Sequence, residues 1–591
     1  MIYNTYQTKI EELQIQINLL KKKGNFCLFG KCLFFFSSVV SCFLYFRYSH
    51  ILFIVLSILL FVAYLIVYAL DNIYQKRIAQ LELIKSVCKR EISCLGGDFS
   101  SLPSGEKYKD LQHEYSYDLD LFGNNSVFHR INRCITQIGS DKLAYRLMNL
   151  SHDKKEILAN QIAIEELASL FDWRIRLMAH PFITTDFTVI SRFFMEDRRS
   201  CYFIKSIIPY VCVALTVLFL FMGIVGLLTW HYFVGMFLFN LCCSSLFLKT
   251  LTIADLNVQK IHKEFTSYID VLEHLHYTVF KSERLSLLQN NLFEGKNCLK
   301  AFQQLSKILN AFDQRSSPIL YVLLNGLILF DVFLIKKVRF WKITYFSDVE
   351  QWLYSIAEMD VLVSWGTYAF NHPDNVVAEI LPDDAKDFFQ AINLYHPFLD
   401  YGKAVPNSFT LGKKRVAIVT GANMAGKSTF LRAIGVNYVL ACNGVPVCAQ
   451  SFKFSVATLF TSMRTTDDLS KDISFFSAEL IRLKSLIQHI RSHEPTLIIL
   501  DEILKGTNSR DKLKGSIVFL REITQYNISA LIATHDLELA KLEEENSKIY
   551  SNYCFDVELS ENITYSYKIS NGVARNLNAS YLLTNMLKGI K

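Results

Sequence analysis

The chain has 591 residues, more than the ~100–200 typical of one domain, so we expect two to four units that each bury a core. Hydrophobic residues make up 51% of it, charged residues only 20%, and the mean hydropathy is +0.22. This composition excludes intrinsic disorder and indicates that part of the chain meets lipid. The net charge of +7 comes from 62 basic and 55 acidic residues, so any surface that binds nucleic acid must be local.

The fourteen cysteines are scattered, with no C-x-x-C pair, and several lie in the most apolar stretches. A zinc site or a disulfide framework would need closely spaced pairs with polar neighbours. We therefore expect reduced thiols packed among apolar side chains, and chemistry that faces the cytosol.

Two apolar stretches near the N-terminus predict a helical hairpin in the membrane. Residues 51–70 are twenty consecutive uncharged positions, enough for a helix to cross ~30 Å of hydrocarbon. Residues 32–46 are also uncharged, and only the segment 47–50 separates the two. No small-residue cleavage site follows this apolar run, so we expect the anchor to be retained.

A second hairpin is predicted over residues 206–248, which contain no Lys, Arg, Asp or Glu and are about twice as long as one span. Basic residues flank the outer ends of both hairpins. By the positive-inside rule, both hairpins begin and end in the cytoplasm. We expect four transmembrane helices in a multi-pass protein of the cell (inner) membrane, with its remaining parts cytoplasmic. The flanking residues are Lys21, Lys22, Lys23, Lys31, Lys76, Arg77, Arg198, Arg199, Lys205 and Lys249.

Residues 318–335 are a weaker membrane candidate, because Asn325 and Asp331 interrupt them. A charge near the middle of a bilayer costs several kcal/mol. The pattern therefore favours a buried core helix over a fifth span.

From about residue 396 the pattern changes to short β-rich runs that alternate with helical stretches, which is typical of a parallel α/β sheet. The run 415–419 leads into a loop and helix that match G-x-x-x-x-G-K-[ST]. Backbone N–H groups of such a loop surround phosphate oxygens at a helix N-terminus. Lys427 would reach the β- and γ-phosphates, and Ser428 would bind Mg²⁺. The loop residues are Gly421, Ala422, Asn423, Met424, Ala425, Gly426, Lys427, Ser428 and Thr429.

Two further strands end in polar residues that suit the same site. The strand 496–500 runs into Asp501 and Glu502, and the strand 529–534 ends at His535. Parallel α/β sheets bind ligands at the carboxyl ends of their strands. Asp501 is predicted to hold Mg²⁺, Glu502 to polarise the attacking water, and His535 to approach the γ-phosphate.

Together these segments closely resemble the ATPase domain of MutS mismatch-repair proteins. The resemblance covers about 115–190 and 250–590 and is strongest in the last 200 residues. Ala422 and Ala425 stand where the family usually has Pro and Gly. The segments that carry the resemblance are 118–123, 360–364, His396-Pro397, Pro406-Asn407, 420–429, 460–469, 474–479, 501–508 and 533–539.

This resemblance implies an ATPase of the ABC superclass that uses ATP and Mg²⁺ and works as a homodimer with nucleotide sites across the subunit interface. Ser474 would contact the γ-phosphate bound by the other subunit, and Asn508 to Asp511 would lie at the subunit contact. The family also implies binding of mismatched or branched DNA through the core and lever region. The first hairpin and a linker take the place of the family's mismatch-reading domain, so no mismatch-reading wedge is expected.

Two alternatives remain open at this stage. One is an ATP-driven interaction or mechanical protein of the membrane with no nucleic-acid substrate, because acidic neighbours surround the basic residues of 250–300. The other is an ABC transporter, which the missing L-S-G-G-Q signature disfavours. The predicted fold is multidomain: an α-helical MutS core and lever region with transmembrane helical hairpins, plus a C-terminal α/β ABC-type P-loop ATPase domain. Its parts are an amphipathic helix 1–25, hairpin 26–70, linker 71–117, the first part of the core 118–200, hairpin 206–248, helical core and lever 250–390 and ATPase 391–591.

Overall fold

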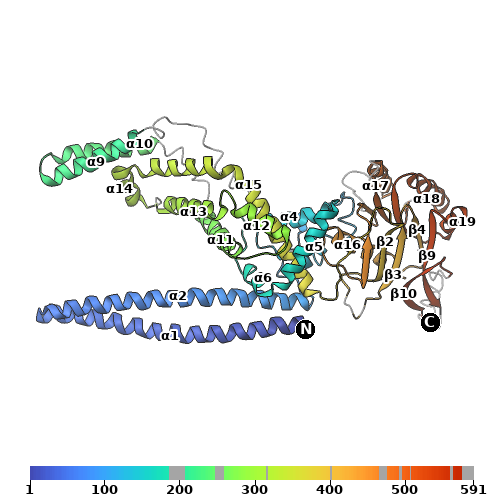
Figure 1. The fold of residues 1–591 in the computed structure, drawn as a ribbon, viewed down its shortest axis with the longest axis horizontal. Helices are drawn as coiled ribbons and strands as arrows, with labels where there is room; N and C mark the ends of the chain where they lie inside the picture. The colour runs from blue at the N-terminus through green and yellow to red at the C-terminus, as the bar shows by residue number, and fades with distance from the viewer. Residues whose placement is uncertain are drawn as a thin grey trace, which may run out of the picture. The chain divides into compact units, whose positions relative to one another are not determined.

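The computed structural model divides the chain into two compact units, each built from discontinuous segments (Figure 1). We name them the helical unit, Met1–Ser101, Leu170–Thr278 and Gly295–Val349, and the sheet unit, Leu102–Ser169, Val279–Glu294 and Glu350–Lys591. The structure describes residues 1–184, 207–246, 258–314, 317–399, 402, 404–464, 475–491, 495–505, 508–559 and 563–575.

The N-terminal part of the helical unit is a hairpin of two long helices, α1 (Ile2–Tyr48) and α2 (Ile51–Leu95). The seam of α1 follows the three- and four-residue spacing of a coiled coil. Its buried positions are Tyr6, Leu13, Ile17, Gly24, Cys27, Ser38 and Ser41. Within the apolar stretches this seam is made of small and hydroxyl side chains, which let helices approach closely in lipid.

Two sequence-based boundaries differ from these helices. The predicted helix 1–25 is not separate, because α1 continues through it to Tyr48. The predicted linker 71–117 is helical as far as Leu95. The reason is that residues 71–95 contain neither Gly nor Pro and continue to bury a stripe of side chains, including Ile78, Leu81 and Val87.

The rest of the helical unit holds shorter helices and the second apolar hairpin. That hairpin consists of α9 (Ile208–Val225) and α10 (Trp230–Leu246), which turn at Gly226 in the left-handed region. The other helices are α6 (Phe171–Leu177), α11 (Val258–His276), α13 (Cys298–Gln314), α14 (Pro318–Ile328) and the first part of α15 (Phe330–Asn371).

Three helices of the described residues are long and apolar enough to cross a membrane: α1, α2 and α9. A fourth would be added if the bent pair α14 and α15 were one span. The expectation of four spans is therefore not reproduced, because α10 has only 17 described residues. Residues 247–257, which include Lys249, and the predicted flanking residues Arg198, Arg199 and Lys205 lie outside the described part of the chain.

The prediction of one core helix over 318–335 is wrong. The helix breaks at Leu329, whose φ is +49°, and the axes of α14 and α15 differ by 83°. Asn325 and Asp331 are fully buried, whereas Ile319 is 73% exposed. The segment thus has a polar inner side and an apolar outer side.

Helices of the sheet unit pack around buried charged groups. Asp360 on α15 accepts hydrogen bonds from the backbone N–H groups of Ile135 and Thr136 at 3.1 and 2.9 Å, which fixes the start of α4. Arg146 donates to Glu358 at 2.8 Å. The helices are η1 (Glu106–Tyr108), α3 (Val127–Ile131), α4 (Gln137–Met148), α5 (Lys154–Ser169), α12 (Glu283–Phe293) and the end of α15.

The C-terminal part contains a six-stranded sheet in the order β10-β9-β4-β8-β7-β6, parallel except for β10. A four-stranded sheet, β1-β5-β2-β3, accompanies it. The predicted α/β fold is confirmed here. The strands are β1 (Glu379–Ile380), β2 (Asp387–Leu394), β3 (Asn407–Gly412), β4 (Val416–Gly421), β5 (Ser451–Phe454), β6 (Thr458–Ser462), β7 (Thr496–Asp501), β8 (Ile528–Thr534), β9 (Tyr550–Leu559) and β10 (Ile563–Asn571). The helices are α16 (Lys427–Cys442), α17 (Phe475–Ile490), α18 (Ser509–Ile523), η5 (Leu537–Lys541) and α19 (Leu542–Glu545).

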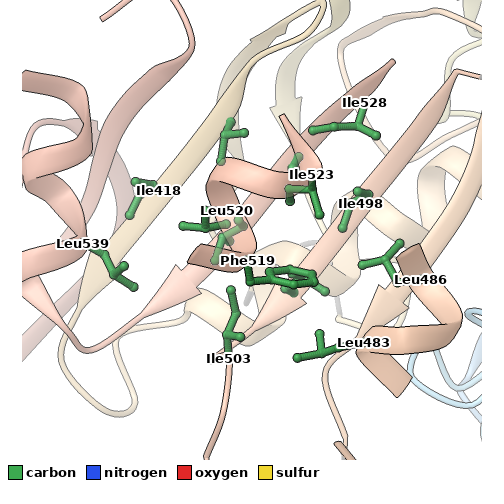
Figure 2. Close-up of a cluster of buried hydrophobic side chains, with 14 of the residues drawn as sticks. Ile418, Leu483, Leu486, Ile498, Ile503, Phe519, Leu520, Ile523, Ile528 and Leu539 are labelled. Carbon is green, nitrogen blue, oxygen red and sulfur yellow. The ribbon is translucent and has the colours of Figure 1, made fainter. Parts of the chain in front are cut away.

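One face of this sheet is closed by an apolar cluster, shown in Figure 2. Ile418 and Ile498 from the central strands meet Phe519 and Leu520 of α18 and Leu486 of α17. Burial of each such side chain stabilises the fold by roughly 1.5–3 kcal/mol. The cluster fixes the strands, so the residues at their carboxyl ends are held on a rigid support.

Candidate nucleotide-binding site

The phosphate-type loop connects the end of β4 to the start of α16. Met424 and Gly426 have φ of +64° and +105°, and the helix begins at Lys427. Glycine adopts the left-handed region without penalty, which explains its place at position 426. The residues that depart from the family pattern, Ala422 and Ala425, are not among the positive-φ positions, so their side chains cause no backbone strain.

Lys427 lies inside this loop with only 5% of its surface exposed. Its Nζ donates to the carbonyl oxygens of Gly421 at 2.8 Å and Ala422 at 3.0 Å, and lies 3.4 Å from the ring nitrogens of His535. Burial lowers the pKa of Lys427 to about 8, although Asp501 and Glu502 act in the opposite direction. An anion bound beside this amine would restore the cation.

Ser428 and Asp501 form the part of the site that suits a divalent cation. The Ser428 hydroxyl donates to Asp501 Oδ2 at 2.5 Å. Mg²⁺ prefers a small number of protein oxygens and completes its shell with phosphates and water. A hydroxyl and a carboxylate beside a phosphate loop fit this preference. Among the described residues there is no cluster of three His, Cys, Asp or Glu side chains that would hold a metal by itself.

Glu502 follows β7 with a φ of +56°, a conformation that non-glycine residues rarely adopt. His535 Nε2 lies 3.0 Å from Glu502 Oε1, and Lys512 Nζ lies 3.7 Å from Glu502 Oε2. The hydrogen bond from His535, together with the Lys512 and Lys505 charges, lowers the pKa of Glu502 to about 2 against the effect of burial. Glu502 is thus held as an anion, in a strained backbone of the kind that gathers at functional sites.

Glu479 on α17 holds the loop that follows Glu502, a role that the sequence did not predict. It is buried, and its two carboxylate oxygens accept hydrogen bonds from the backbone N–H groups of Leu504 at 2.5 Å and Lys505 at 2.9 Å. Leu504 has a φ of +60°. The available signal was an acidic residue among apolar ones in the segment 475–490, but its partners are distant in sequence.

The sequence also did not predict the aromatic residues that line the cavity. Tyr567 lines the cavity from β10, where the register shifts and its φ is +52°. Asn407 holds this irregular strand, because it donates to the carbonyl oxygen of Tyr567 at 3.0 Å and accepts from the Ile569 N–H at 2.8 Å. Tyr395 and His396 line the cavity as well, and burial lowers the pKa of His396 to about 4.

These groups surround one cavity of about 550 Å³, a size suited to a small ligand. Gly421 ends β4 just outside this lining. Ser474, predicted to reach across a dimer, lies outside the described residues. The predicted residues that line the cavity are Ala422, Asn423, Met424, Ala425, Gly426, Lys427, Ser428, Thr429, Asp501, Glu502 and His535.

Comparison with known proteins identifies this region. Residues 417–584 match the family model for MutS domain V. The DNA mismatch repair protein MutS of Thermotoga sp. (strain RQ2) is 29% identical over 225 residues, 37% of this chain and 27% of that protein. MutS of Acetivibrio thermocellus is 32% identical over 231 residues, 38% of this chain and 26% of that protein. The probable DNA mismatch repair protein Msh6 of Drosophila melanogaster is 27% identical over 241 residues, 39% of this chain and 20% of that protein.

The matched region thus spans 20 to 27% of the length of these relatives. It contains the loop, both carboxylates and the histidine described above, on a sheet of the expected type. Residues 417–584 of this chain are thus similar to domain V of MutS proteins.

Proposed function

We propose that this chain is a membrane-anchored, dimeric MutS-type protein that hydrolyses ATP in the cavity at the carboxyl ends of β4, β7 and β8. The observation that carries the proposal is the convergence of Lys427, the Ser428–Asp501 pair and the Glu502–His535 pair on one cavity. Each group has a separate task in phosphoryl transfer.

Each residue of the site has its own role in the proposed hydrolysis of ATP. The loop N–H groups bind phosphate oxygens, and Lys427 exchanges its two carbonyl acceptors for the β- and γ-phosphates. Ser428 and Asp501 would hold Mg²⁺, which neutralises phosphate charge when it is bound. Glu502, anionic at neutral pH, orients the attacking water and accepts its proton, while His535 keeps the carboxylate in place.

The dimer is proposed from the family. Ser474 would complete the partner's site, and the segment from Asn508 to Asp511 would lie at the contact. Asn508 begins α18 by accepting a hydrogen bond from the Asp511 N–H at 3.0 Å, so this segment has a defined shape. ATP binding would close the two sites and hydrolysis would open them, which changes the positions of the attached helices.

The relatives are named for DNA mismatch repair, and we propose that DNA, mismatched or branched, is bound through the core and lever region without a mismatch-reading wedge. A second candidate, an ATP-driven mechanical or interaction protein with no nucleic acid, is favoured by a specific observation. Arg284 lies 3.0 Å from Glu358, and Lys296 lies 2.7 Å from Asp348, so these basic residues are neutralised by internal partners.

An ATPase assay on the full chain in detergent tests both candidates. Lys427→Ala is expected to abolish hydrolysis, because the cation that holds the phosphates is lost. Wild-type protein is then compared with no DNA, perfect duplex, mismatched duplex and branched DNA. Stimulation by mismatched or branched DNA alone supports the first candidate, and equal rates with all four supports the second. Undiminished hydrolysis by Lys427→Ala would exclude the site.

The membrane anchor rests on the three candidate helices, and we propose the cell (inner) membrane with the ATPase domain in the cytoplasm. The full chain should sediment with membranes and resist extraction by high salt. A variant without residues 26–70 and 206–248 should become soluble. Recovery of the full chain in the detergent-free soluble fraction would contradict this proposal.

A further inference from the structure

The helix α14 packs against the second apolar hairpin within the helical unit, beside α10 and α9 (Figure 1). Asn240 of α10 donates to the carbonyl oxygen of Gly326 at 3.0 Å and to the Thr216 hydroxyl of α9 at 2.8 Å. Gly326 allows this approach, because a Cβ at that position would lie 2.2 Å from the Phe237 ring. The end of α14 is therefore fitted to the hairpin.

These contacts also give the depth of α14 in the hairpin. Thr216 lies eight residues after Ile208, the start of α9, so about 12 Å along that helix. If α9 crosses a hydrocarbon layer of ~30 Å, Gly326 lies well inside it. The eleven residues of α14 span only about 16 Å, too short to cross.

The break after α14 is satisfied in a way that suits a membrane. Irregular backbone at membrane depth is tolerated only where protein groups complete its hydrogen bonds. The Asn325 side-chain oxygen accepts from the backbone N–H of Asp331 at 2.9 Å and from the Ser244 hydroxyl of α10 at 3.1 Å. Asn325 and Asp331 are fully buried, so these polar groups face protein.

The outer side of α14 is apolar, and the chain that follows is basic. The outward side chains of α14 are Ile319, Leu320, Val322, Leu323 and Ile328. After the bend, Lys336 Nζ lies 4.3 Å from the centre of the Tyr210 ring, near the start of α9. An aromatic ring and a lysine at a helix end are typical of the membrane–water interface. Lys337, Arg339 and Lys342 follow within two turns.

We propose that residues 318–342 form a re-entrant membrane element: α14 inserts into the cytoplasmic half of the bilayer beside α9 and α10, and the basic residues 336–342 bind anionic phospholipid headgroups. This inference rests on the proposed membrane anchor. Buried polar groups, a lipid-facing apolar side and a basic end at one depth all fit a lipid partner, whereas a core helix would be covered by protein.

Photocrosslinking of the full chain in vesicles of phosphatidylcholine and phosphatidylglycerol tests the insertion. Ile319→benzoylphenylalanine is expected to form a product heavier by one phospholipid. Leu218→benzoylphenylalanine on α9 is the control for the anchor, and Tyr277→benzoylphenylalanine, an exposed position on the loop after α11, should form none. Lipid adducts at 218 but none at 319, or a crosslinked protein dimer at 319, would overturn the inference. No adduct at either position would overturn the anchor as well.

The headgroup contact is tested with the double variant Lys337→Gln and Lys342→Gln. Each charge near an anionic surface is worth roughly a five-fold change in binding. The protein is reconstituted in mixed nanodiscs, and the phosphatidylglycerol that remains bound after delipidation is counted by mass spectrometry. The matched control, Lys300→Gln with Lys307→Gln, removes two exposed charges from α13. Retention in the first variant equal to that in the control would overturn headgroup binding.

Discussion

Hydrogen-bonded polar side chains are arranged differently in two regions of this protein, the edge of the large sheet and the seams of the apolar hairpins. In the hairpins they form closed pairs. Ser38 donates to the carbonyl oxygen of Ser57 at 3.0 Å, and Ser57 donates back to that of Ser38 at 2.9 Å. The Asn240 amide donates to the Thr216 hydroxyl and to the carbonyl oxygen of Gly326.

In the proposed nucleotide site at the sheet edge, a ligand would replace one partner of each pair. Lys427 donates to carbonyl oxygens that its own loop supplies, and Ser428 donates to a carboxylate that a cation would take over. The difference teaches that burial alone does not mark a functional polar group. What marks it is a cavity beside the group and a partner that phosphate or Mg²⁺ can replace.

The largest effect is expected from Glu502→Gln, which keeps the shape of the side chain but removes the base. We expect turnover to fall by roughly 10²–10⁴-fold, because a positioned general base contributes that much. ATP binding should persist, since the loop and Lys427 are unchanged. Both are measured on one preparation, as phosphate release and as binding of a fluorescent ATP analogue.

Glu538→Gln is the matched control, because Glu538 lies on η5 and pairs with the exposed Lys541. Its turnover should equal that of the wild type. Equal turnover in Glu502→Gln would remove Glu502 from the role of base and weaken the distinction between exchangeable and closed pairs.

A second, roughly tenfold effect should follow from the pH dependence of ATP binding. The pKa of Lys427 is lowered to about 8, and phosphate binds only the protonated amine. Above pH 8 the free protein loses this proton and ATP binding must restore it, so the affinity should fall about tenfold from pH 7 to pH 9. Glu502, with its pKa near 2, does not titrate in this range.

Titration of the fluorescent ATP analogue between pH 7 and 9.5 measures this effect. The free nucleotide changes little in charge over that range, and the same titration by calorimetry should record proton uptake above pH 8. A flat affinity to pH 9.5 would mean that Lys427 stays charged in the free protein. The hydrogen bonds of Lys427 would then resemble the closed pairs of the hairpins more closely.

The phosphate loop and its neighbours could be predicted because their signals are local. Lys427 and Ser428 follow a strand within a few residues, and Asp501 and His535 end strands whose parallel order brings them together. Glu479 and Tyr567 could not be assigned this way. Glu479 acts on a loop 25 residues away, and Tyr567 depends on an irregularity in β10 that Asn407 stabilises.

The apolar helices were predicted less completely for a related reason. Hydropathy locates apolar runs, but it does not show which polar residues find partners. In the sequence, Asn325 and Asp331 favour a core helix, whereas the structure places a bend between them and pairs Asn325 with α10. The seam of α1 also extends N-terminal to the apolar run, where composition suggested a boundary.

A smaller effect, on stability, is expected for Asn240→Ala. The change removes two interhelical hydrogen bonds, which are worth about 1 kcal/mol in membrane proteins. The variant should unfold at lower denaturant concentration in detergent, with unchanged affinity for ATP. Ser245→Ala in the same helix is the control, because its hydroxyl donates to the carbonyl oxygen of Cys242 within α10. Equal stability of the two variants would show that the network does not join the helices.

The smallest effect should come from Ser38→Ala. The matched substitution at the sheet edge is Ser428→Ala. Each removes one hydroxyl from a helix. Ser38 bonds across the hairpin to Ser57, so its loss should lower the unfolding free energy by only about 0.6 kcal/mol and leave hydrolysis unchanged. Ser428 bonds to Asp501 where Mg²⁺ would bind, so its loss should leave stability nearly unchanged and reduce hydrolysis, with more Mg²⁺ needed for half-maximal rate. Thermal unfolding and Mg²⁺-dependent phosphate release are measured on both variants. Ser38→Ala should lower the stability more, whereas Ser428→Ala should reduce phosphate release more. If both variants change only the stability, Ser428 has a structural role like that of Ser38, and the two regions do not differ at these two serines.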